Sequence, residues 1–312
     1  MTRLAIIIPA YKTEFLSETL DSLSRQTCKQ FKVYIGDDCS PNDVQSIVNR
    51  YSDRLPIVYR RFDTNLGGCD LIAQWERCLD MTDGEEFFCM FSDDDVMMPQ
   101  NVELFYRVLD EKEITDVYHF DIDIVNRDLK PIRRRRDYPE CLTARQFFRL
   151  LYMGKIDARM PEFVFRREAF DSNGGFVRFD LAFRSDNATV MVNSRNKPIL
   201  TVKGSRVLWR DSGVNVSSKG NTELNERRVM ASIDFFNWLD GFFNDEGVDF
   251  PLPLVPRIKT YVRELLLLYP QRKKPELHQL MEKIDFFRLN PGMMRLGKIY
   301  MARKIFKKRF KI

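Results

Sequence analysis

Three consecutive carboxylates, Asp93, Asp94 and Asp95, are the residues in this sequence best suited to chemistry. They follow an apolar run at 87–91 that predicts a buried strand, and they precede Pro99, a favourable first residue for a helix. Adjacent like charges are tolerated best when they are solvated or share a cation. Oxygen ligands favour a hard ion, Mg²⁺ or Mn²⁺. The residues alone leave an acidic turn at a helix N-terminus as an equal alternative.

Polar segments also follow the other strands expected in the N-terminal part, at 4–8, 31–36 and 57–62. These segments are Pro9 to Lys12, the pair Asp37 and Asp38, and the turn 65–68. Helical spacing at 15–23, 43–51, 71–79 and 102–109 alternates with the strands, which is typical of a doubly wound parallel sheet. Such sheets bind ligands beyond the carboxyl ends of their strands. We therefore expect an α/β fold in which four strand ends converge on one site.

The pattern changes towards the C-terminus. We expect a strand at 117–122, a hairpin at 124–132, a helix at 143–152 capped by Thr143, a short strand at 162–165 and a helix opened by Ser185 or Asp186. Strands at 199–202 and 207–209 precede a polar loop at 210–213, and helices are expected at 224–243, 256–268 and 276–287. The predicted division is an α/β domain at 1–215, a helical region at 216–290 and a basic amphipathic tail at 291–312.

Composition excludes several classes of protein. The 312-residue chain has no apolar run near the ~20 residues of a spanning helix, and its start turns polar too quickly for a signal peptide. Its six scattered cysteines lack paired metal-ligand spacing, and two histidines are too few for a His-rich zinc site. No GxGxxG follows the first strand, and no GxxxxGK[ST] occurs. We expect a cytoplasmic protein with reduced thiols.

The charge is concentrated in the tail. Residues 291–312 contain eight basic residues and no acidic one, whereas the net charge of the whole chain is +5. Basic and apolar residues mixed in this way suit an amphipathic helix on an anionic membrane surface. A helix packed on the body and a disordered tail are the alternatives. The acidic strand ends and the lack of a base-reading motif argue against nucleic acid as a partner.

Five segments, in this order, resemble a family 2 glycosyltransferase with the GT-A fold over the first ~215 residues. They are IIIPAYK, FKVYIGDDCSPND, NLGG, SDDDVMMP and, after GGF, RSDN. The resemblance implies a Rossmann-type, mostly parallel sheet flanked by helices, here with a C-terminal helical extension. The C-terminal hundred residues show no motif of the family.

The resemblance also implies roles for individual residues. It assigns nucleotide contacts to Pro9, Ala10, Tyr11, Asp38, Asn65 and Asp93, metal ligation to Asp94 and Asp95, and the catalytic base to Asp186. Arg210 or Asp211 could close over the diphosphate or the metal. Two departures from the family pattern are Ser92, which replaces the first Asp of the common motif, and Ser185, which replaces the Glu before the base.

The residues themselves leave plainer roles open for two of these positions. Asp186 could cap the helix that follows it, and Asp38 could satisfy loop amides. The processive signature QxxRW is absent, because the expected region has the sequence WRDSGVNVS.

The implied activity is that of an inverting, non-processive hexosyltransferase of the bacterial polysaccharide-biosynthesis type, dependent on Mn²⁺ or Mg²⁺. It would move one sugar from a nucleotide-diphospho-sugar to a hydroxyl of a saccharide or lipid-linked acceptor, on the inner face of the plasma membrane. A catalytically silent nucleotide-sugar-binding module and a sugar-phosphate nucleotidyltransferase are the alternatives. The sequence leaves open whether the chain forms a homodimer.

Overall fold

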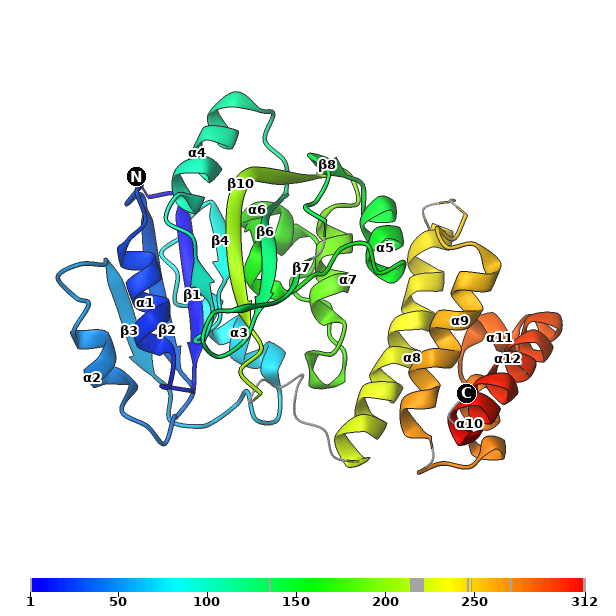
Figure 1. Cartoon of the computed structure of the whole chain (residues 1–312). Coiled ribbons are helices and arrows are strands. Elements are labelled where there is room, and N and C mark those ends of the chain that lie inside the picture. The colour runs from blue at the N-terminus through cyan, green and yellow to red at the C-terminus, as the bar shows by residue number, and fades with distance from the viewer. Residues whose placement is uncertain are drawn as a thin grey trace. The chain divides into compact units, whose positions relative to one another are not determined.

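The computed structural model describes residues 2–134, 136–213, 222–245, 247, 249–269 and 271–310 (Figure 1). The chain divides into two compact units. Unit 1 comprises Met1–Arg178 and Ser185–Ser218, and unit 2 comprises Phe179–Arg184 and Lys219–Ile312. The predicted boundary between 215 and 216 lies outside the described residues, and the division at 290 stays a prediction.

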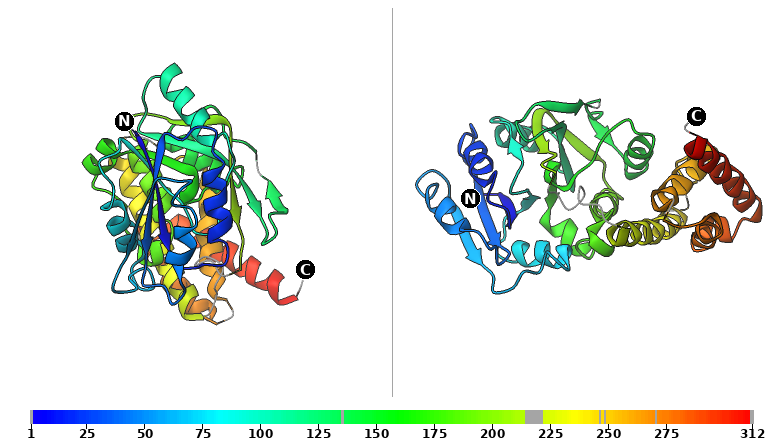
Figure 2. Two further views of the ribbon diagram at one scale, coloured as in Figure 1. Left: turned by 90° about the vertical axis from the view of Figure 1, so that its left-hand side faces the viewer. Right: turned by 60° about the horizontal axis from the view of Figure 1, so that its bottom comes forward.

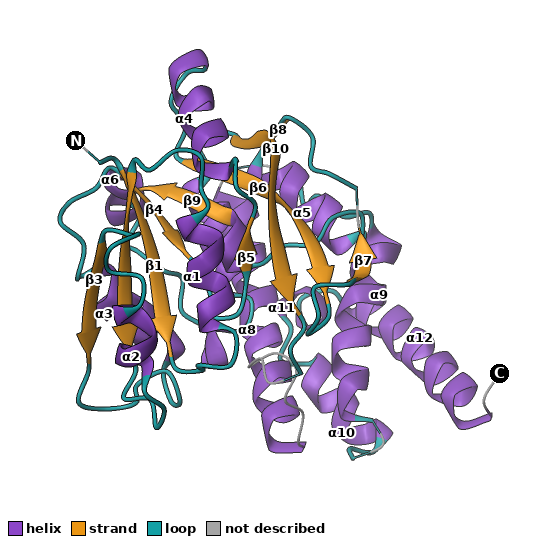
Figure 3. Cartoon of the chain, turned by 60° about the vertical axis from the view of Figure 1, so that its left-hand side comes forward, coloured by secondary structure: helices purple, strands orange, loops and turns teal. Residues whose placement is uncertain are grey.

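Unit 1 is built on a mixed sheet with the strand order β3-β2-β1-β4-β9-β6-β10-β5. β1, β2, β3 and β4 are mutually parallel, as are β6 and β10, whereas β9 runs antiparallel between β4 and β6. Figure 3 shows the arrowheads of β1 and β3 at one edge of the sheet. The strands are β1 (Leu4–Ala10), β2 (Phe31–Asp37), β3 (Ile57–Arg61), β4 (Phe87–Met90), β5 (Val96–Met97), β6 (Val117–Val125), β7 (Pro131–Arg134), β8 (Cys141–Leu142), β9 (Phe163–Arg166) and β10 (Ile199–Arg210).

Helices cover the parallel half of the sheet because its central strands β1 and β2 are buried along nearly their whole length, so both faces of the sheet need cover. Leu4, Ile6 and Ile8 of β1 share one buried core with α1 (Leu16–Ser24), α2 (Val44–Asn49) and α4 (Asn101–Glu111). α3 (Leu71–Leu79) packs on β1 and β2. Gly36 permits this approach, because a Cβ there would lie 2.3 Å from Cys78 Sγ. The predicted α/β class is confirmed.

The remaining helices of unit 1 lie between β8 and β10 in the chain. They are α5 (Ala144–Tyr152), α6 (Arg167–Ser172) and α7 (Ser185–Asn193), with a 3₁₀ turn at Met160–Glu162. Thr143 caps α5 as predicted, since its hydroxyl accepts from Gln146 N at 3.2 Å in a capping box. The predicted hairpin is the antiparallel pair β6 and β7.

Two local predictions were wrong. Pro99 does not open a helix: α4 begins at Asn101, and Val96–Met97 instead forms β5, which pairs antiparallel with β10. The two late strands are one, β10, because the pairing with β6 continues across an irregularity between Thr201 and Arg206. Arg210 therefore ends a strand, although the sequence predicted a loop there.

Unit 2 is helical. It contains α8 (Thr222–Asp245), α9 (Leu254–Leu265), α10 (Lys274–Met281), α11 (Asp285–Arg288) and α12 (Pro291–Phe310), so the single helix expected at 276–287 is two. α12, red near the C label in Figure 2, packs on α9 and α11. Gly297 permits the approach to α11, because a Cβ there would lie 2.9 Å from the ring of Phe287. Among the residues described, no helix is both long and apolar enough to cross a bilayer.

Candidate active site

The carboxyl ends of the four parallel strands meet at one edge of the sheet. The register pairs Ala10 with Asp37 and Asp37 with Arg61, so the loops after β1, β2 and β3 begin side by side. Backbone bonds tie these loops together: Asp38 N donates to Ala10 O at 2.9 Å, and Phe91 N donates to Ile7 O at 2.7 Å. The predicted convergence of strand ends is therefore present.

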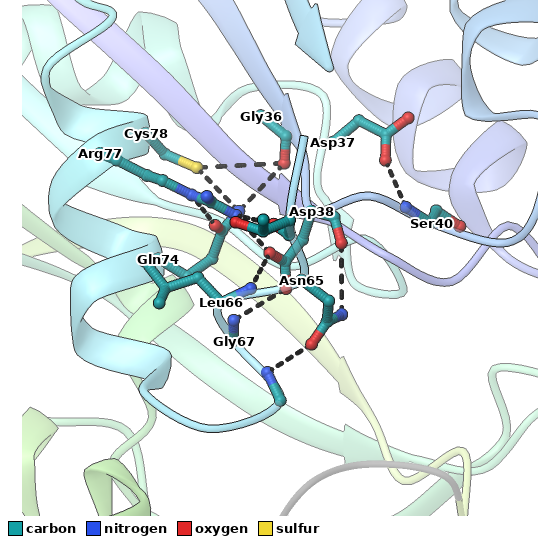
Figure 4. A network of polar contacts seen from close by, with 12 residues as sticks. Gly36, Asp37, Asp38, Ser40, Asn65, Leu66, Gly67, Gln74, Arg77 and Cys78 are labelled. Carbon is teal, nitrogen blue, oxygen red and sulfur yellow. Dashed lines mark hydrogen bonds and ion pairs between the residues drawn. The ribbon is translucent and has the colours of Figure 1, made fainter. Parts of the chain in front are cut away.

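Asp37 and Asp38 are held by donors from the protein itself. The fully buried Asp37 carboxylate accepts from Ser40 N at 2.8 Å, Tyr59 Oη at 2.7 Å and Arg61 Nη1 at 2.9 Å. Burial and the hydrogen-bonded Asp37 carboxylate raise the pKa of the Tyr59 phenol. The pair therefore organises its own loop (Figure 4).

Asp38 anchors the turn that follows β3. Its Oδ1 accepts from Leu66 N at 2.7 Å and from the guanidinium of Arg77 on α3, and its Oδ2 accepts from Gly67 N at 2.9 Å (Figure 4). Asn65 completes the turn, donating to Asp38 O at 3.2 Å and accepting from Gly68 N at 2.9 Å. Asp38 thus satisfies loop amides, as the plainer prediction held.

Asp93 fixes the loop after β1. Its Oδ2 accepts from Tyr11 N at 3.0 Å and Lys12 N at 2.7 Å, and Tyr11 O accepts from Ser40 Oγ at 2.6 Å. These bonds hold the backbone of Tyr11, while 43% of the residue's surface stays exposed. An aromatic ring is therefore presented at the strand ends on a fixed backbone.

Asp94 is held by side chains alone. Lys12 Nζ lies 2.5 Å from Asp94 Oδ2 and 3.2 Å from Asp93 Oδ1, and Ser212 Oγ donates to Asp94 Oδ2 at 3.1 Å. Burial lowers the pKa of Lys12, but the charges of Asp93 and Asp94 outweigh it and raise that pKa above its ordinary value. The Asp94 carboxylate therefore depends on two side-chain donors from other loops.

Asp95 is short of donors. It is fully buried, and its Oδ1 accepts from Arg210 N at 2.8 Å. Its Oδ2 is also buried and accepts no hydrogen bond from the described residues. Burial and the neighbouring charge of Asp94 raise the pKa of Asp95 to about 8, although hydrogen bonds from Arg210 N and from the side chain of Ser92 to this carboxyl group oppose the rise. An orphaned carboxylate oxygen of this kind is costly unless a proton or a cation meets it.

Arg210 supports this cluster from behind. It is fully buried; its Nε donates to Asp94 O at 2.8 Å, and its Nη2 to Glu18 Oε2 at 2.8 Å. The guanidinium thus holds the main chain of Asp94. Its neighbour Asp211 is exposed, with its backbone N bonded to Val125 O at 2.8 Å.

Asp186 lies in the first turn of α7 and is half-buried. Its Oδ1 accepts from Asn187 N at 2.8 Å, which matches the helix-terminal role left open by the sequence. Burial raises the pKa of Glu162, and the charge of Asp186 adds to that rise.

Sequence reasoning missed three contributors. Lys12 and Ser212 bind Asp94, and Arg77 binds Asp38. Lys12 had a visible signal, because it directly follows Tyr11 in a loop at a strand end. Arg77 and Ser212 had none, since helical spacing and a polar loop do not say which side chain turns inward.

A buried pair of titratable groups lies deeper in the sheet. His119 Nε2 and Glu162 Oε1 are 3.3 Å apart and fully buried, and the ring of Tyr138 stacks on His119 with centroids 3.5 Å apart. Burial lowers the pKa of His119 and raises that of Glu162. His119 is therefore packed in the core.

The cluster suits an ion that the substrate helps to bind. Within the described ranges, no three His, Cys, Asp or Glu side chains form a ready metal cage. Asp94 and Asp95 offer two carboxylates, one with an orphaned oxygen. Mg²⁺ and similar ions are often held by one or two carboxylates together with substrate phosphates, so the residues present fit such an ion.

Comparisons with known proteins agree with this arrangement. A family model described as "Glycosyl transferase family 2" matches residues 5–174. A glycosyltransferase of Haemophilus influenzae is 29% identical over 175 residues, which are 55% of this chain and 55% of that protein. The chain spans between 21% and 55% of the length of the curated relatives it matches.

Solved structures show the same fold. Staphylococcus aureus TarS, crystallised with UDP-GlcNAc, superposes with a TM-score of 0.60 at 18% identity and covers 99% of this chain and 92% of its own. A mannosyltransferase from Pyrobaculum calidifontis with GDP-Man and Mn²⁺ gives 0.54 at 14% identity, covering 97% and 86%. These likenesses establish the GT-A type of fold, as the sequence predicted.

Proposed function

The chain belongs to glycosyl transferase family 2, and from that premise we propose that it moves one hexose from a nucleotide-diphospho-sugar to an acceptor hydroxyl. The observation that carries the proposal is the buried pair Asp94 and Asp95 at the strand ends, where one carboxylate oxygen has no donor among the described residues. A cation bound with the negatively charged donor would offset its repulsion by these carboxylates. The family and the fold supply the reaction class.

The nucleotide would bind along the loops after β1 and β2. Pro9, Ala10 and Tyr11 would present the base with an exposed ring on a fixed backbone, which suits stacking. Asp38 Oδ1 already accepts two bonds, whereas Oδ2 accepts one, from Gly67 N. One lone pair of Oδ2 thus stays available for a base N–H. Asn65 would act by shaping this turn.

Asp93 would contact the ribose. Its Oδ2 accepts two backbone N–H groups, while its Oδ1 faces only the ammonium of Lys12, at 3.2 Å. A ribose hydroxyl that donates to Oδ1 would replace or join that ammonium. The two backbone N–H groups bonded to Oδ2 would keep the Asp93 carboxylate in place meanwhile.

Asp94 and Asp95 would hold Mn²⁺ or Mg²⁺ against the donor diphosphate. When bound, such an ion supplies positive charge that stabilises the leaving nucleoside diphosphate. Arg210 would keep the main chain of Asp94 in position through its 2.8 Å bond, and the exposed Asp211 could approach the diphosphate. Because no three potential ligand side chains gather into a metal cage within the described residues, oxygens of the substrate would supply remaining ligands.

Asp186 would act as the base. It would take the proton of the acceptor hydroxyl as that oxygen bonds to the anomeric carbon. The carbon–oxygen bond to the diphosphate breaks in the same displacement, so the configuration inverts. The half-burial of Asp186 leaves it accessible to an acceptor.

Product analysis with a panel of nucleotide sugars tests the reaction. UDP-GlcNAc and GDP-mannose, the ligands of the two structural neighbours, are the first donors to try. We expect release of a nucleoside diphosphate, with a 10²- to 10⁴-fold loss in Asp186→Asn and unchanged donor binding. Donor binding without turnover would favour a silent binding module, and release of pyrophosphate would indicate a nucleotidyltransferase.

We also propose that α12 lies on an anionic membrane surface, which would place the enzyme beside a lipid-linked acceptor in cell-surface polysaccharide or glycolipid synthesis. Leu296, Ile299 and Phe306 are 46%, 60% and 57% exposed on this basic helix. Beside them, a groove of about 440 Å³ is lined by Lys274, Arg295 and Lys298. Apolar anchors next to cations suit acidic lipid headgroups.

Vesicle sedimentation of the full chain tests this surface. Binding to vesicles with acidic lipid should exceed binding to neutral vesicles, and Ile299→Glu with Phe306→Glu should abolish it. Exposed positions of unit 1, such as Asp110→Lys, serve as a control. Equal sedimentation of all variants would refute the membrane role and leave the transferase proposal untouched.

A further inference from the structure

The ammonium of Lys12 lies where the cluster of carboxylates most needs a cation. Its Nζ is 2.5 Å from Asp94 Oδ2 and 3.2 Å from Asp93 Oδ1. Lys12 N also donates to Asp93 Oδ2 at 2.7 Å, so the same residue is bound at its backbone and at its tip. The arrangement brings the loop after β1 onto the loop after β4.

Lys12 is the one cation this cluster has in the described part of the chain. No other described Lys or Arg side chain comes within 4.0 Å of a carboxylate oxygen of Asp93, Asp94 or Asp95. The guanidinium of Arg210 is directed to the main-chain oxygen of Asp94 instead. The lysine side chain is 30% exposed, so it has room to leave.

A divalent ion and this ammonium compete for the same oxygen. An ion bound to Asp94 Oδ2 at the usual ~2.1 Å could lie at most about 4.6 Å from Lys12 Nζ where it now stands. Positive charges so close repel strongly in a partly buried site. The lysine must therefore move away when the ion binds.

We propose that Lys12 is a resident counter-cation that occupies the metal position until the donor arrives, and then turns to the donor diphosphate. This inference rests on the proposed function, because it assumes a donor diphosphate at the strand ends. It predicts that the protein binds a divalent ion poorly by itself and well together with a nucleoside diphosphate. A lysine ammonium with its donors released is a good phosphate ligand.

Two affinities measured on Lys12→Met test the inference. Mn²⁺ alone should bind the variant at least tenfold more tightly than wild type, because the competing charge is gone. A nucleoside diphosphate in saturating Mn²⁺ should bind about tenfold more weakly, because the diphosphate loses a cation. Mn²⁺ can be followed by electron paramagnetic resonance and the nucleotide by calorimetry. A merely structural lysine would not move the two affinities in opposite directions.

Controls keep the test decisive. Lys32→Met removes an ammonium that pairs with Asp83 away from the site, and it should change neither affinity. Lys12→Gln, which can still donate to Asp94, repeats the test if the Met variant folds poorly. Unchanged or weaker binding of Mn²⁺ in both Lys12 variants overturns the inference while wild type still binds Mn²⁺ with nucleotide. Failure of wild type to bind any nucleotide with Mn²⁺ overturns the donor site and this inference together.

Discussion

Two acidic pairs follow neighbouring regions of the same sheet, and they differ in how their charge is met. Asp37 and Asp38 accept hydrogen bonds from backbone amides, a tyrosine and two arginines. Asp94 and Asp95 are met by one lysine, two serines and one amide, and no described residue donates a hydrogen bond to Oδ2 of Asp95. Both pairs are buried, so solvent does not explain the difference.

Asp37 and Asp38 are carboxylates that hold the loops of the site in place, whereas Asp94 and Asp95 retain capacity to bind a ligand. A buried polar group is normally satisfied within the fold, and a shortfall marks either strain or a missing partner. The first pair shapes the loops after β2 and β3. The second pair has the capacity for a cation that the fold itself does not supply.

The largest effect on stability is expected at Asp37. Asp37→Asn removes the charge that Arg61 and Tyr59 meet, and turns an amide N–H₂ towards donors. We expect a loss of about 3 kcal/mol in the free energy of unfolding, since one partner of a buried pair is removed. Urea denaturation measures it. A loss below about 0.5 kcal/mol would show that Asp37 does not build the loop.

A smaller loss is expected at Asp38. In Asp38→Asn, an NH₂ group replaces one carboxylate oxygen and faces the N–H of Leu66 or Gly67. Arg77 also loses its charge partner. We expect about 2 kcal/mol, the penalty for a buried donor left without an acceptor. Nucleotide affinity should fall too, since the turn is released. Normal stability with lost affinity would make Asp38 purely a ligand contact.

The turn itself offers a third test. A Cβ at Gly67 would lie 2.8 Å from Asp38 Oδ2, so Gly67→Ala should cost about 1–2 kcal/mol by pushing the carboxylate from its amides. Gly241→Ala in α8 is the matched control, because no atom lies within 4 Å of the added methyl and alanine favours a helix. Equal effects of the two substitutions would argue against the constraint at Gly67.

Substitution of Asp95 should stabilise the protein at high pH, whereas substitution of Asp37 or Asp38 should destabilise it. Its folded pKa of about 8 exceeds its ordinary value of 3.8, so the folded carboxyl keeps a proton that the unfolded chain has released. Stability should therefore decline as pH rises from about 4 to 8 in metal-free buffer. Asp95→Asn should flatten this decline and be more stable than wild type at pH 8, by about 1 kcal/mol. Unfolding in EDTA across this range measures it, and a variant less stable at every pH would contradict the account.

The sequence was sufficient for features that depend on local pattern. Alternating strands and helices predicted the parallel half of the sheet, Thr143 predicted the cap of α5, and three adjacent carboxylates predicted an acidic strand end. Each follows from periodicity or spacing along the chain. The predicted ligand roles of these residues stay predictions.

The rest depended on contacts between distant segments. β9 enters the sheet antiparallel between β4 and β6, and the burial of Arg210 follows from β10 pairing with β6 and β5. Asp37 and Asp94 look alike in the sequence. They differ in the donors that meet them, such as Tyr59, 22 residues from Asp37, and Ser212, 118 residues from Asp94. No local signal carries such information.

Calorimetric titration with nucleoside diphosphates, with and without Mn²⁺, tests the central claim most directly. The account predicts that one nucleotide binds wild type only with Mn²⁺, and that Asp94→Ala loses at least 100-fold in affinity. Asp110→Ala, on the exposed side of α4, should bind as wild type does. Equal binding by Asp94→Ala, or binding indifferent to Mn²⁺, would contradict the claim that this cluster holds the donor through a cation.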